Sequence, residues 1–186
     1  MIVCFTGKPG AGKTSVAVYK VWKWAKKEGL VVFSNMNTLK YPDVEVRYIS
    51  VKDLPRIRRG IVLLDEANYI FNSRFWDRID ADIIRHWQMH RKRTIDIVLT
   101  SHSLKRIDKI LRELVQYEYR VRKGMFGFWV YSYDLDIEDS KPLVMYYPRW
   151  VIKRAWSWFD THEEIEVLDA SAGGGFPAVL GGGPQR

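Results

Sequence analysis

The sequence predicts an α/β fold in which a mainly parallel β-sheet is flanked by helices. Apolar runs with the length of strands occur at residues 2–6, 61–64 and 95–100, and the last two are apolar enough to be buried on both faces. Segments with helical periodicity lie between these runs. A glycine-rich loop joins the first strand to the first helix, and two acidic residues follow the second strand. Strands that alternate with helices in this way are typical of one α/β domain.

The loop at residues 7–14, GKPGAGKT, fits the phosphate-loop pattern GxxxxGK[ST] at every defined position. Its glycines would let successive backbone N–H groups point at a triphosphate, and the start of the next helix would add N–H groups and a positive dipole end. We expect ATP as the ligand, with Mg²⁺ on the hydroxyl of the last loop residue; an ordinary glycine-rich turn is the alternative. The expected nucleotide contacts are Gly7, Lys8, Pro9, Gly10, Ala11, Gly12, Lys13, Thr14 and Ser15.

The helix behind the loop is expected at residues 14–27, where the apolar side chains share one stripe and a glycine follows. Residues 30–34 are a short apolar run and residues 44–49 alternate apolar and polar side chains, so both are predicted strands. Ser50 and Asp53 then have the spacing of a capping box for a brief helical turn.

The second chemical motif is Asp65-Glu66, directly after the apolar run at residues 61–64. This is the pattern of a Walker B strand, in which Asp65 would hold Mg²⁺ together with Thr14 at the edge facing the phosphate loop. Glu66 would polarise the water that attacks the γ-phosphate, while Lys13 would bind the β- and γ-phosphates. A strand-ending acidic turn with no catalytic role is the alternative.

Residues 77–92 show helical spacing and contain His86 and His90, four positions apart. Two imidazoles at that separation can share a metal ion, but the segment lacks the glutamate of a zinc hydrolase helix and any neighbouring Cys. We therefore favour a surface position or a nucleic-acid contact for both side chains over a metal site.

A basic run, Arg91-Lys92-Arg93, is expected to close this helix. One interpretation is that it complements the negative end of the helix dipole. The other is that an arginine enters the nucleotide site of a neighbouring subunit and stabilises the charge that develops at the γ-phosphate. Arg91 and Arg93 are the leading candidates for this catalytic role, ahead of Arg85.

The predicted strand at residues 95–100 ends in Thr100-Ser101-His102. A polar side chain at the end of a strand beside the Walker B strand can touch the γ-phosphate or its water, so Ser101 and His102 are candidate nucleotide contacts. Thr100 could serve equally, and His102 could instead contact the next helix. That helix is expected at residues 103–115, with an apolar stripe and basic side chains on its other faces.

The C-terminal part of the chain has four predicted features. Residues 117–122 and 126–133 alternate like a β-hairpin, and residues 142–147 add a strand. Residues 150–159 are rich in tryptophan and could be a helix covering the core, an interfacial helix on a membrane or a partner-docking helix; we favour the first. Residues 170–186 contain two Gly-Gly-Gly groups and are expected to be a flexible tail.

These features divide the chain into three parts. Residues 1–123 form the ATPase core, residues 124–169 a strand and helix extension of the same domain, and residues 170–186 the tail. A length of 186 residues suits one domain of this kind.

The composition indicates which kinds of binding partner the chain favours. A formal net charge of +8 favours a polyanion, either nucleic acid or an anionic membrane surface. Cys4 is the sole cysteine, so an internal disulfide is excluded and the side chain is expected to pack in the core. The sequence shows neither a signal-peptide pattern nor a membrane-spanning apolar run, and we expect a soluble protein of the host-cell cytoplasm, with a peripheral position at a membrane, procapsid or virion as the other option.

The motifs GKPGAGKT, IVLLDEA, HRKR and IDIVLTSH, followed by YRVRKG, together resemble the Zot-like ATPases of filamentous phages, within the broader FtsK/HerA group of DNA-pumping ATPases. The resemblance covers residues 1–123. It implies a RecA-like P-loop NTPase core, subunits that form a homo-oligomeric ring, and ATP-driven movement of viral DNA with virion or membrane assembly proteins as further partners.

This sequence departs from the Zot-like pattern in two ways. The membrane-spanning helix and outer domain common in that family are not found in this sequence, which leaves packaging open beside extrusion. The glutamine usual after the sensor strand is replaced by Ser101-His102.

Three functions remain open from the sequence. The one we favour is an oligomeric ATPase that couples hydrolysis to DNA movement in virion assembly, packaging or extrusion. The second is a small-molecule or nucleotide kinase, which is disfavoured because no arginine-rich lid is evident and a water-activating Glu66 would waste ATP. The third is a nucleotide-gated assembly factor that binds nucleotide with little turnover.

Overall fold

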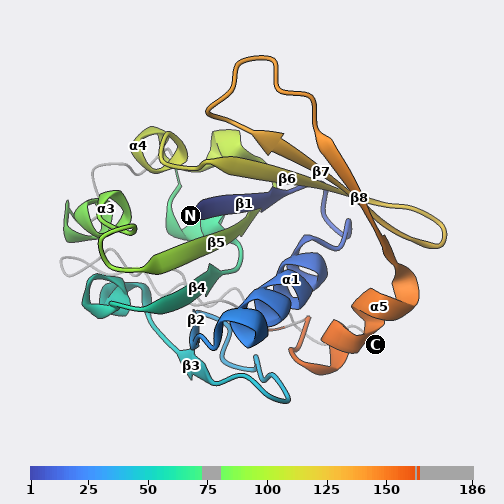
Figure 1. Ribbon diagram of the computed structural model, residues 1–186, viewed down its shortest axis with the longest axis horizontal. Helices are drawn as coiled ribbons and strands as arrows, with labels where there is room; N and C mark the ends of the chain where they lie inside the picture. The colour runs from blue at the N-terminus through green and yellow to red at the C-terminus, as the bar shows by residue number, and fades with distance from the viewer. Residues whose placement is uncertain (73–80, 162, 164–186) are drawn as a thin grey trace, which may run out of the picture.

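The computed structural model describes residues 1–72, 81–161 and 163. Within these residues one eight-stranded sheet has the order β3-β2-β4-β5-β1-β6-β7-β8 (Figure 1). The strands from β3 to β6 in that order are parallel, and β7 and β8 extend the sheet in antiparallel fashion. The strands are β1 Ile2–Thr6, β2 Val32–Ser34, β3 Val46–Tyr48, β4 Gly60–Leu64, β5 Ile95–Ser101, β6 Tyr117–Lys123, β7 Gly127–Asp134 and β8 Leu143–Pro148. The helices are α1 Lys13–Glu28, α2 Ala67–Ile70, α3 Ala81–Gln88, α4 Lys109–Arg112 and α5 Arg149–Lys153, with 3₁₀ turns η1 Val51–Arg56, η3 Leu104–Arg106 and η4 Arg154–Ser157.

The central strands are buried on both faces, as their continuous apolar sequences predict. Successive side chains of a strand point to opposite faces, so Val3 of β1 joins one core cluster while Cys4 joins the other. The first cluster packs the sheet against α1, α5 and η4, and the second packs it against η1, α2, α3 and α4. The result is a sheet between two helical layers, and the expected core position of Cys4 is confirmed.

The strand order places the functional motifs at one edge of the sheet. Strand β5 lies between β1 and β4 and is parallel to both. The three strands therefore end side by side, at Thr6, Leu64 and Ser101. The phosphate loop, Asp65-Glu66 and His102 follow these ends, at the edge where open parallel sheets bind ligands.

The prediction of a single helix at residues 103–115 is wrong. The segment forms two short pieces, η3 and α4, which are separated at Asp108. The Asp108 side chain accepts a hydrogen bond from the N–H of Ile110 at 2.9 Å, and its own N–H donates to the carbonyl of Phe71 at 2.9 Å. A local N-cap and a tertiary hydrogen bond thus override the helical periodicity.

The helix expected at residues 77–92 is described from Ala81, and it ends at Gln88 rather than continuing through the basic run. Residues 89–94 form turns, and Thr94 has a positive φ of 55° before β5 begins. The capping box at Ser50 and Asp53 is present at the start of η1, where the Asp53 carboxylate accepts from the Ser50 N–H at 3.0 Å.

The C-terminal extension covers the core, as favoured from the sequence. Ile152 and Ala155 are fully buried beside α1, whereas Trp150 remains 66% exposed. Within residues 1–72, 81–161 and 163, no helix combines the length and apolar character needed to cross a bilayer. The predicted tail at residues 170–186 lies outside the described residues.

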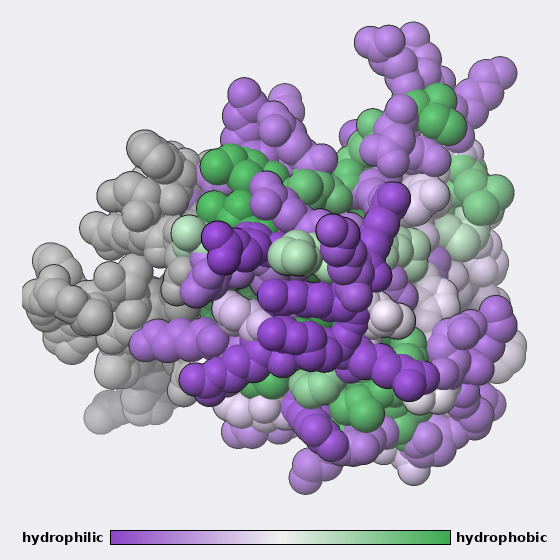
Figure 2. All heavy atoms as spheres, turned by 60° about the vertical axis from the view of Figure 1, so that its left-hand side comes forward, coloured by the Kyte–Doolittle hydropathy of each residue, from purple (hydrophilic) through white to green (hydrophobic). Residues whose placement is uncertain are grey.

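One face of the molecule is strongly cationic. Figure 2 shows hydrophilic side chains gathered over the end of the molecule that carries α3 and η1. Two segments meet there, because Arg93 donates to the carbonyl of Pro55 at 3.0 Å. We call this surface the cationic face; its exposed members are Arg56, Arg58, Arg59, Arg85, Arg91 and Lys92.

Candidate nucleotide site

The phosphate loop closes directly onto the first turn of α1. Gly12 is the N-cap residue of this helix and has a left-handed backbone, with φ 87° and ψ 21°. A Cβ atom at Gly12 would also collide with the ring of Phe128, so both the backbone and the surroundings require glycine here. Within the loop, the N–H of Ala11 donates to the carbonyl of Lys8 at 3.1 Å. The helix therefore begins with its unpaired N–H groups at the loop, as an anion site requires.

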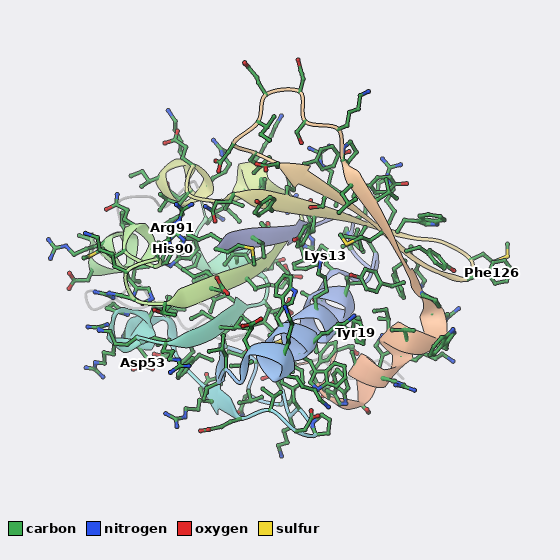
Figure 3. All side chains as sticks on the ribbon, viewed as in Figure 1. Lys13, Tyr19, Asp53, His90, Arg91 and Phe126 are labelled. Atoms are coloured by element: carbon green, nitrogen blue, oxygen red, sulfur yellow. The ribbon has the colours of Figure 1, made fainter. Side chains whose placement is uncertain are left out.

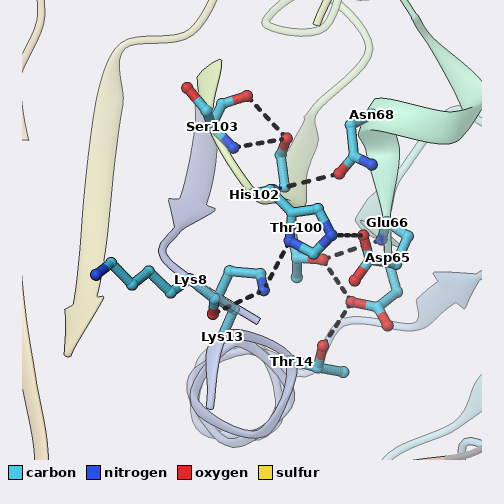
Figure 4. Close-up of polar contacts among 10 residues, drawn as sticks. Lys8, Lys13, Thr14, Asp65, Glu66, Asn68, Thr100, His102 and Ser103 are labelled. Carbon is cyan, nitrogen blue, oxygen red and sulfur yellow. Dashed lines mark hydrogen bonds and ion pairs between the residues drawn. The ribbon is translucent and has the colours of Figure 1, made fainter. Parts of the chain in front are cut away.

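Asp65 joins the loop to the two neighbouring strand ends (Figure 4). Its Oδ1 accepts a hydrogen bond from the hydroxyl of Thr14 at 2.8 Å. The same atom accepts a second hydrogen bond from the hydroxyl of Thr100, at the end of β5. The side-chain amide of Asn35, which follows β2, donates to the Asp65 carbonyl at 3.1 Å and accepts from the Asp65 N–H at 2.8 Å. Asp65 is thus fixed through both its backbone and its carboxylate.

The charge state of Asp65 reflects burial. Only 8% of the residue is exposed, and this burial raises the pKa of its carboxyl. The hydrogen bonds from Thr100 and Thr14 and the charge of Lys13 act in the opposite direction. A hydroxyl and a carboxylate oxygen 2.8 Å apart are hard oxygen donors of the kind that Mg²⁺ prefers, so Thr14 and Asp65 fit the metal expected from the sequence.

Glu66 has an unusual backbone conformation. It is left-handed, with φ 50° and ψ 43°, and its N–H donates to the hydroxyl of Thr100 at 3.0 Å. Such a conformation costs a non-glycine residue about 1–2 kcal/mol. The turn directs the side chain into the site, where Oε2 is buried without a hydrogen-bond partner and lies 3.7 Å from Nε2 of His102. An unsatisfied carboxylate oxygen can accept a proton from water.

His102 links the lysine of the loop to Glu66. Its Nδ1 lies 3.3 Å from Nζ of Lys13, and its backbone N–H donates to Oδ1 of Asn68 at 3.3 Å. Burial lowers the pKa of His102, with contributions from Lys13 and Arg106, while the charge of Glu66 opposes the shift. A neutral imidazole that accepts from Lys13 at Nδ1 carries its proton on Nε2, on the side of Glu66.

Lys13, Thr14, Asp65, Glu66 and His102 line one cavity. Its volume is about 750 Å³, which lies within the size range of small-molecule sites. The cavity receives side chains from the phosphate loop, the ends of β4 and β5, and the C-terminal extension. Its lining residues are Pro9, Gly10, Gly12, Lys13, Thr14, Ser15, Met36, Asp65, Glu66, Tyr69, His102, Lys123, Phe128, Trp156, Phe159, Asp160, Thr161 and Glu163.

The three sensor candidates have different surroundings. Thr100 is fully buried; its hydroxyl donates to the Asp65 carboxylate and accepts from the Glu66 N–H. His102 lines the cavity. Ser101 is also fully buried, and its hydroxyl donates to the carbonyl of Ser103 at 2.9 Å. Of the three, His102 is the one that reaches the cavity.

Arg91 and Arg93 lie far from the loop of their own chain. Figure 3 shows Arg91 and Lys13 in different parts of the molecule. The two arginines precede β5, whereas the loop follows the end of β1. Because β1 and β5 are parallel, the start of one and the end of the other lie at opposite edges of the sheet. Arg93 is engaged by Pro55 and by Nδ1 of His86, whereas Arg91 is exposed. Any contact of these arginines with a nucleotide would therefore be made in a neighbouring subunit.

The expected surface position of His86 and His90 is wrong. His86 is fully buried and His90 is 7% exposed, with Nδ1 of His90 2.7 Å from the carbonyl of Trp87. Burial and the neighbouring Arg93 lower the pKa of His86 to about 4. Among the described residues no cluster of three or more His, Cys, Asp or Glu could hold a metal ion.

Some residues of the site were not anticipated from the sequence. Asn35 directly follows a predicted strand, and a polar residue at that position is a signal that could have identified it. Asn68 lies in the short helix α2, two residues after Glu66, and its side chain accepts from the N–H of His102. Trp156 is assigned to the core-covering segment by its aromatic neighbours, and nothing in the local pattern indicates that it lines the cavity.

Solved structures share this fold. The N-terminal domain of zonular occludens toxin from Neisseria meningitidis superposes with a TM-score of 0.62 at 21% identity, over 86% of this chain and 98% of that one. The genome packaging NTPase B204 from Sulfolobus turreted icosahedral virus 2, in complex with ATP-gammaS, gives a TM-score of 0.59 at 12% identity, over 79% and 96%. The fold is thus the RecA-like P-loop NTPase fold expected from the sequence.

Sequence relatives come from phages. The Gene 1 protein of Enterobacteria phage I2-2 is 29% identical over 131 residues, which cover 58% of this chain and 36% of that protein. The Gene 1 protein of Escherichia phage If1 is 29% identical over 170 residues, covering 74% and 47%. The chain therefore spans less than half of the length of these relatives. The family model described as zonular occludens toxin (Zot) matches residues 1–144, and the chain belongs to this family.

Proposed function

We propose that this chain is the ATP-hydrolysing subunit of an oligomeric motor that moves viral DNA during virion assembly, packaging or extrusion. The observation that carries the proposal is the convergence of Lys13, Thr14, Asp65 and Glu66 on one cavity. These are the groups needed to bind a triphosphate, hold its metal and activate water.

Binding of the triphosphate is assigned to the loop and the first turn of α1. Their backbone N–H groups take the phosphate oxygens, and Lys13 neutralises the β- and γ-phosphates. Thr14 and Asp65 would hold Mg²⁺, which supplies charge neutralisation at the phosphates when bound. Lys13 lies 3.5 Å from the carbonyl of Lys8 and 3.3 Å from His102, both neutral acceptors, so its charge is available to phosphate.

Hydrolysis is assigned to Glu66. Its Oε2 would accept a proton from water as the water oxygen attacks the γ-phosphorus and the bond to the β-phosphate oxygen breaks, giving ADP and phosphate. His102 is placed to orient Glu66 and to respond to the loss of the γ-phosphate, because it touches both Glu66 and Lys13. His102 directly follows the end of β5, where a residue that senses the γ-phosphate is expected.

The DNA partner is supported by charge and by family. The chain carries a formal net charge of +8, and the cationic face presents six exposed Arg and Lys side chains from two adjoining segments. A polyanion is the partner such a surface would attract. The sequence relatives are phage Gene 1 proteins, and a genome packaging NTPase shares the fold. On this basis we propose viral DNA as the partner, a homo-oligomeric ring, and a place in the host cytoplasm or at the periphery of a membrane or procapsid.

The test is phosphate release measured with and without single-stranded and double-stranded DNA, together with the mass of the nucleotide-bound assembly. We expect hydrolysis that DNA stimulates and that Lys13→Ala abolishes. Strict dependence on a nucleoside acceptor would instead identify a kinase. DNA affinity should fall with salt with a slope of about −0.9 per phosphate neutralised on duplex, and binding that is independent of salt would contradict a phosphate-based contact.

A matched pair of double variants tests the contribution of the cationic face. Arg59→Ala with Lys92→Ala removes two exposed cations from it, and Lys23→Ala with Lys27→Ala removes two exposed cations from α1 on the other side of the sheet. We expect the first pair alone to reduce the salt slope, by about 1–2. Equal effects of both pairs would show that only net charge matters.

A further inference from the structure

The C-terminal extension contributes an aromatic side chain to the nucleotide cavity. Trp156 lies in η4, and its indole Nε1 donates to the hydroxyl of Ser15 at 3.1 Å. Ser15 directly follows Thr14 in the first turn of α1. The indole is 38% exposed and lines the same cavity as Lys13 and Asp65. A residue 141 positions along the chain is thus fixed beside the phosphate loop.

The position of the reacting phosphate determines where the rest of a nucleotide must go. Asp65, Glu66 and His102 come from the ends of β4 and β5 and define the end of the cavity where the γ-phosphate reacts. The α-phosphate and the nucleoside must leave the loop in another direction, along the first turn of α1 past Ser15. The wall met there is formed by Trp156, Phe159, Asp160, Thr161 and Glu163.

The indole is held in a way that leaves it suited to stacking. Its only polar atom is occupied by Ser15, so the ring orientation is fixed and the side chain carries no unsatisfied donor into the cavity. The guanidinium carbon of Arg149, at the start of α5, lies over one face of the ring at 6.0 Å from its centroid, so a stacked ligand would use the opposite face. A fixed aromatic plane loses little side-chain freedom when a flat ligand binds on it.

We propose that Trp156 forms the nucleobase subsite of this cavity and stacks on the purine ring of the bound nucleoside triphosphate. The proposal rests on the proposed function, since it requires a triphosphate in the loop. Stacking on an aromatic ring is tolerant of base identity, because every base has a π-face. The subsite therefore adds affinity for the nucleoside and makes the extension part of the nucleotide-binding unit.

The experiment compares two ligands that differ in the nucleoside alone. Equilibrium affinities for ATP and for inorganic tripolyphosphate, each with Mg²⁺, are measured for the full chain and three variants: Trp156→Ala, Trp156→Phe and Trp150→Ala. Trp150 is the matched control, because it lies in the neighbouring α5, is 66% exposed and does not line the cavity. Binding of tripolyphosphate reports an intact loop in every variant.

We expect Trp156→Ala to weaken ATP binding about tenfold and to leave tripolyphosphate binding unchanged. Trp156→Phe should retain most of the ATP affinity, and Trp150→Ala should match the parent for both ligands. Equal ATP affinity in Trp156→Ala and the parent would overturn the subsite. So would equal losses for ATP and tripolyphosphate, which would assign Trp156 to support of the loop through Ser15.

The outcome also separates this inference from the function on which it rests. If the parent binds ATP and Lys13→Ala does not, the phosphate site stands and the Trp156 variants decide the subsite alone. If the parent binds neither ligand, or if Lys13→Ala binds both equally well, the proposed ATPase is refuted and the nucleobase subsite with it.

Discussion

The hydroxyl of Thr14 donates to Oδ1 of Asp65 at 2.8 Å, joining the first turn of α1 to the end of β4 across the intervening strand β5. The two residues are 51 positions apart in the chain. Their contact brings a phosphate-loop hydroxyl and a strand-end carboxylate to one point, as a shared metal ion requires.

Substitution of either partner should therefore remove metal-dependent hydrolysis. We expect Asp65→Asn and Thr14→Ala each to lower the rate of phosphate release at least a hundredfold, and chelation of Mg²⁺ to do the same to the parent. Thr14→Ser, which keeps the hydroxyl, is the control and should retain most of the activity. Full activity of Asp65→Asn with Mg²⁺ present would remove Asp65 from the metal site.

Glu66→Gln should separate binding from chemistry. The amide keeps the shape of the side chain but cannot take a proton, so we expect phosphate release to fall about 10²- to 10⁴-fold while ATP affinity stays near that of the parent. Single-turnover hydrolysis and equilibrium ATP binding measure the two effects. A variant that hydrolyses as well as the parent would mean that the base is idle, as in a nucleotide-gated assembly factor.

An arginine acting between subunits should be detectable in mixed assemblies. Lys13→Ala subunits lack a working nucleotide site and Arg91→Ala subunits lack the proposed trans contact, so mixing them creates some interfaces with both groups intact. We expect each variant alone to be inactive and the mixture to regain part of the ATPase rate. Absence of recovery in assemblies of the parent mass would argue against Arg91.

Arg93 needs a separate control in that experiment. Its side chain donates to the carbonyl of Pro55 at 3.0 Å and contacts His86, so Arg93→Ala is expected to lower the free energy of unfolding as well. Arg91 is exposed, and Arg91→Ala should unfold at the same denaturant concentration as the parent. Mixing with Arg93→Ala is therefore carried out under conditions in which this less stable variant is still fully folded.

His86 should make the stability depend on pH below neutrality. Burial and Arg93 lower its pKa from the ordinary 6.5 to about 4 in the folded state. As the pH falls from about 6.5 to about 4, the unfolded chain takes up a proton that the folded chain does not, so stability is lost in that window, by up to about 3 kcal/mol. Denaturant unfolding across this range should show a smaller loss for His86→Gln, whose amide oxygen can still accept from Arg93. An unchanged pH profile in that variant would contradict the assignment.

The sequence was most informative where chemistry and periodicity act locally. The phosphate loop and the Asp65-Glu66 pair could be recognised as candidate phosphate and metal ligands because that chemistry requires particular residue types at fixed spacing. The central strands could be assigned because burial on both faces requires continuous apolar runs. The position of β5 between β1 and β4 is a property of the fold class, and no single residue of these strands indicates it.

The remaining features depend on contacts that are distant in sequence. Asp108 interrupts a helical pattern because its N–H finds the carbonyl of Phe71, and His86 is buried because it packs under the cationic face with Arg93. Trp156 reaches Ser15 from the far end of the chain. Tertiary partners of this kind override local propensity and leave no local signal.

The contact between Gly12 and Phe128 has a consequence for dissecting the molecule. Phe128 lies in β7, beyond the boundary at residue 123 expected from the sequence, yet its ring fills the space in front of the N-cap of α1. A fragment that stopped at that boundary would keep every Walker residue but lose this support. The smallest piece that keeps the loop supported should therefore extend at least through β7.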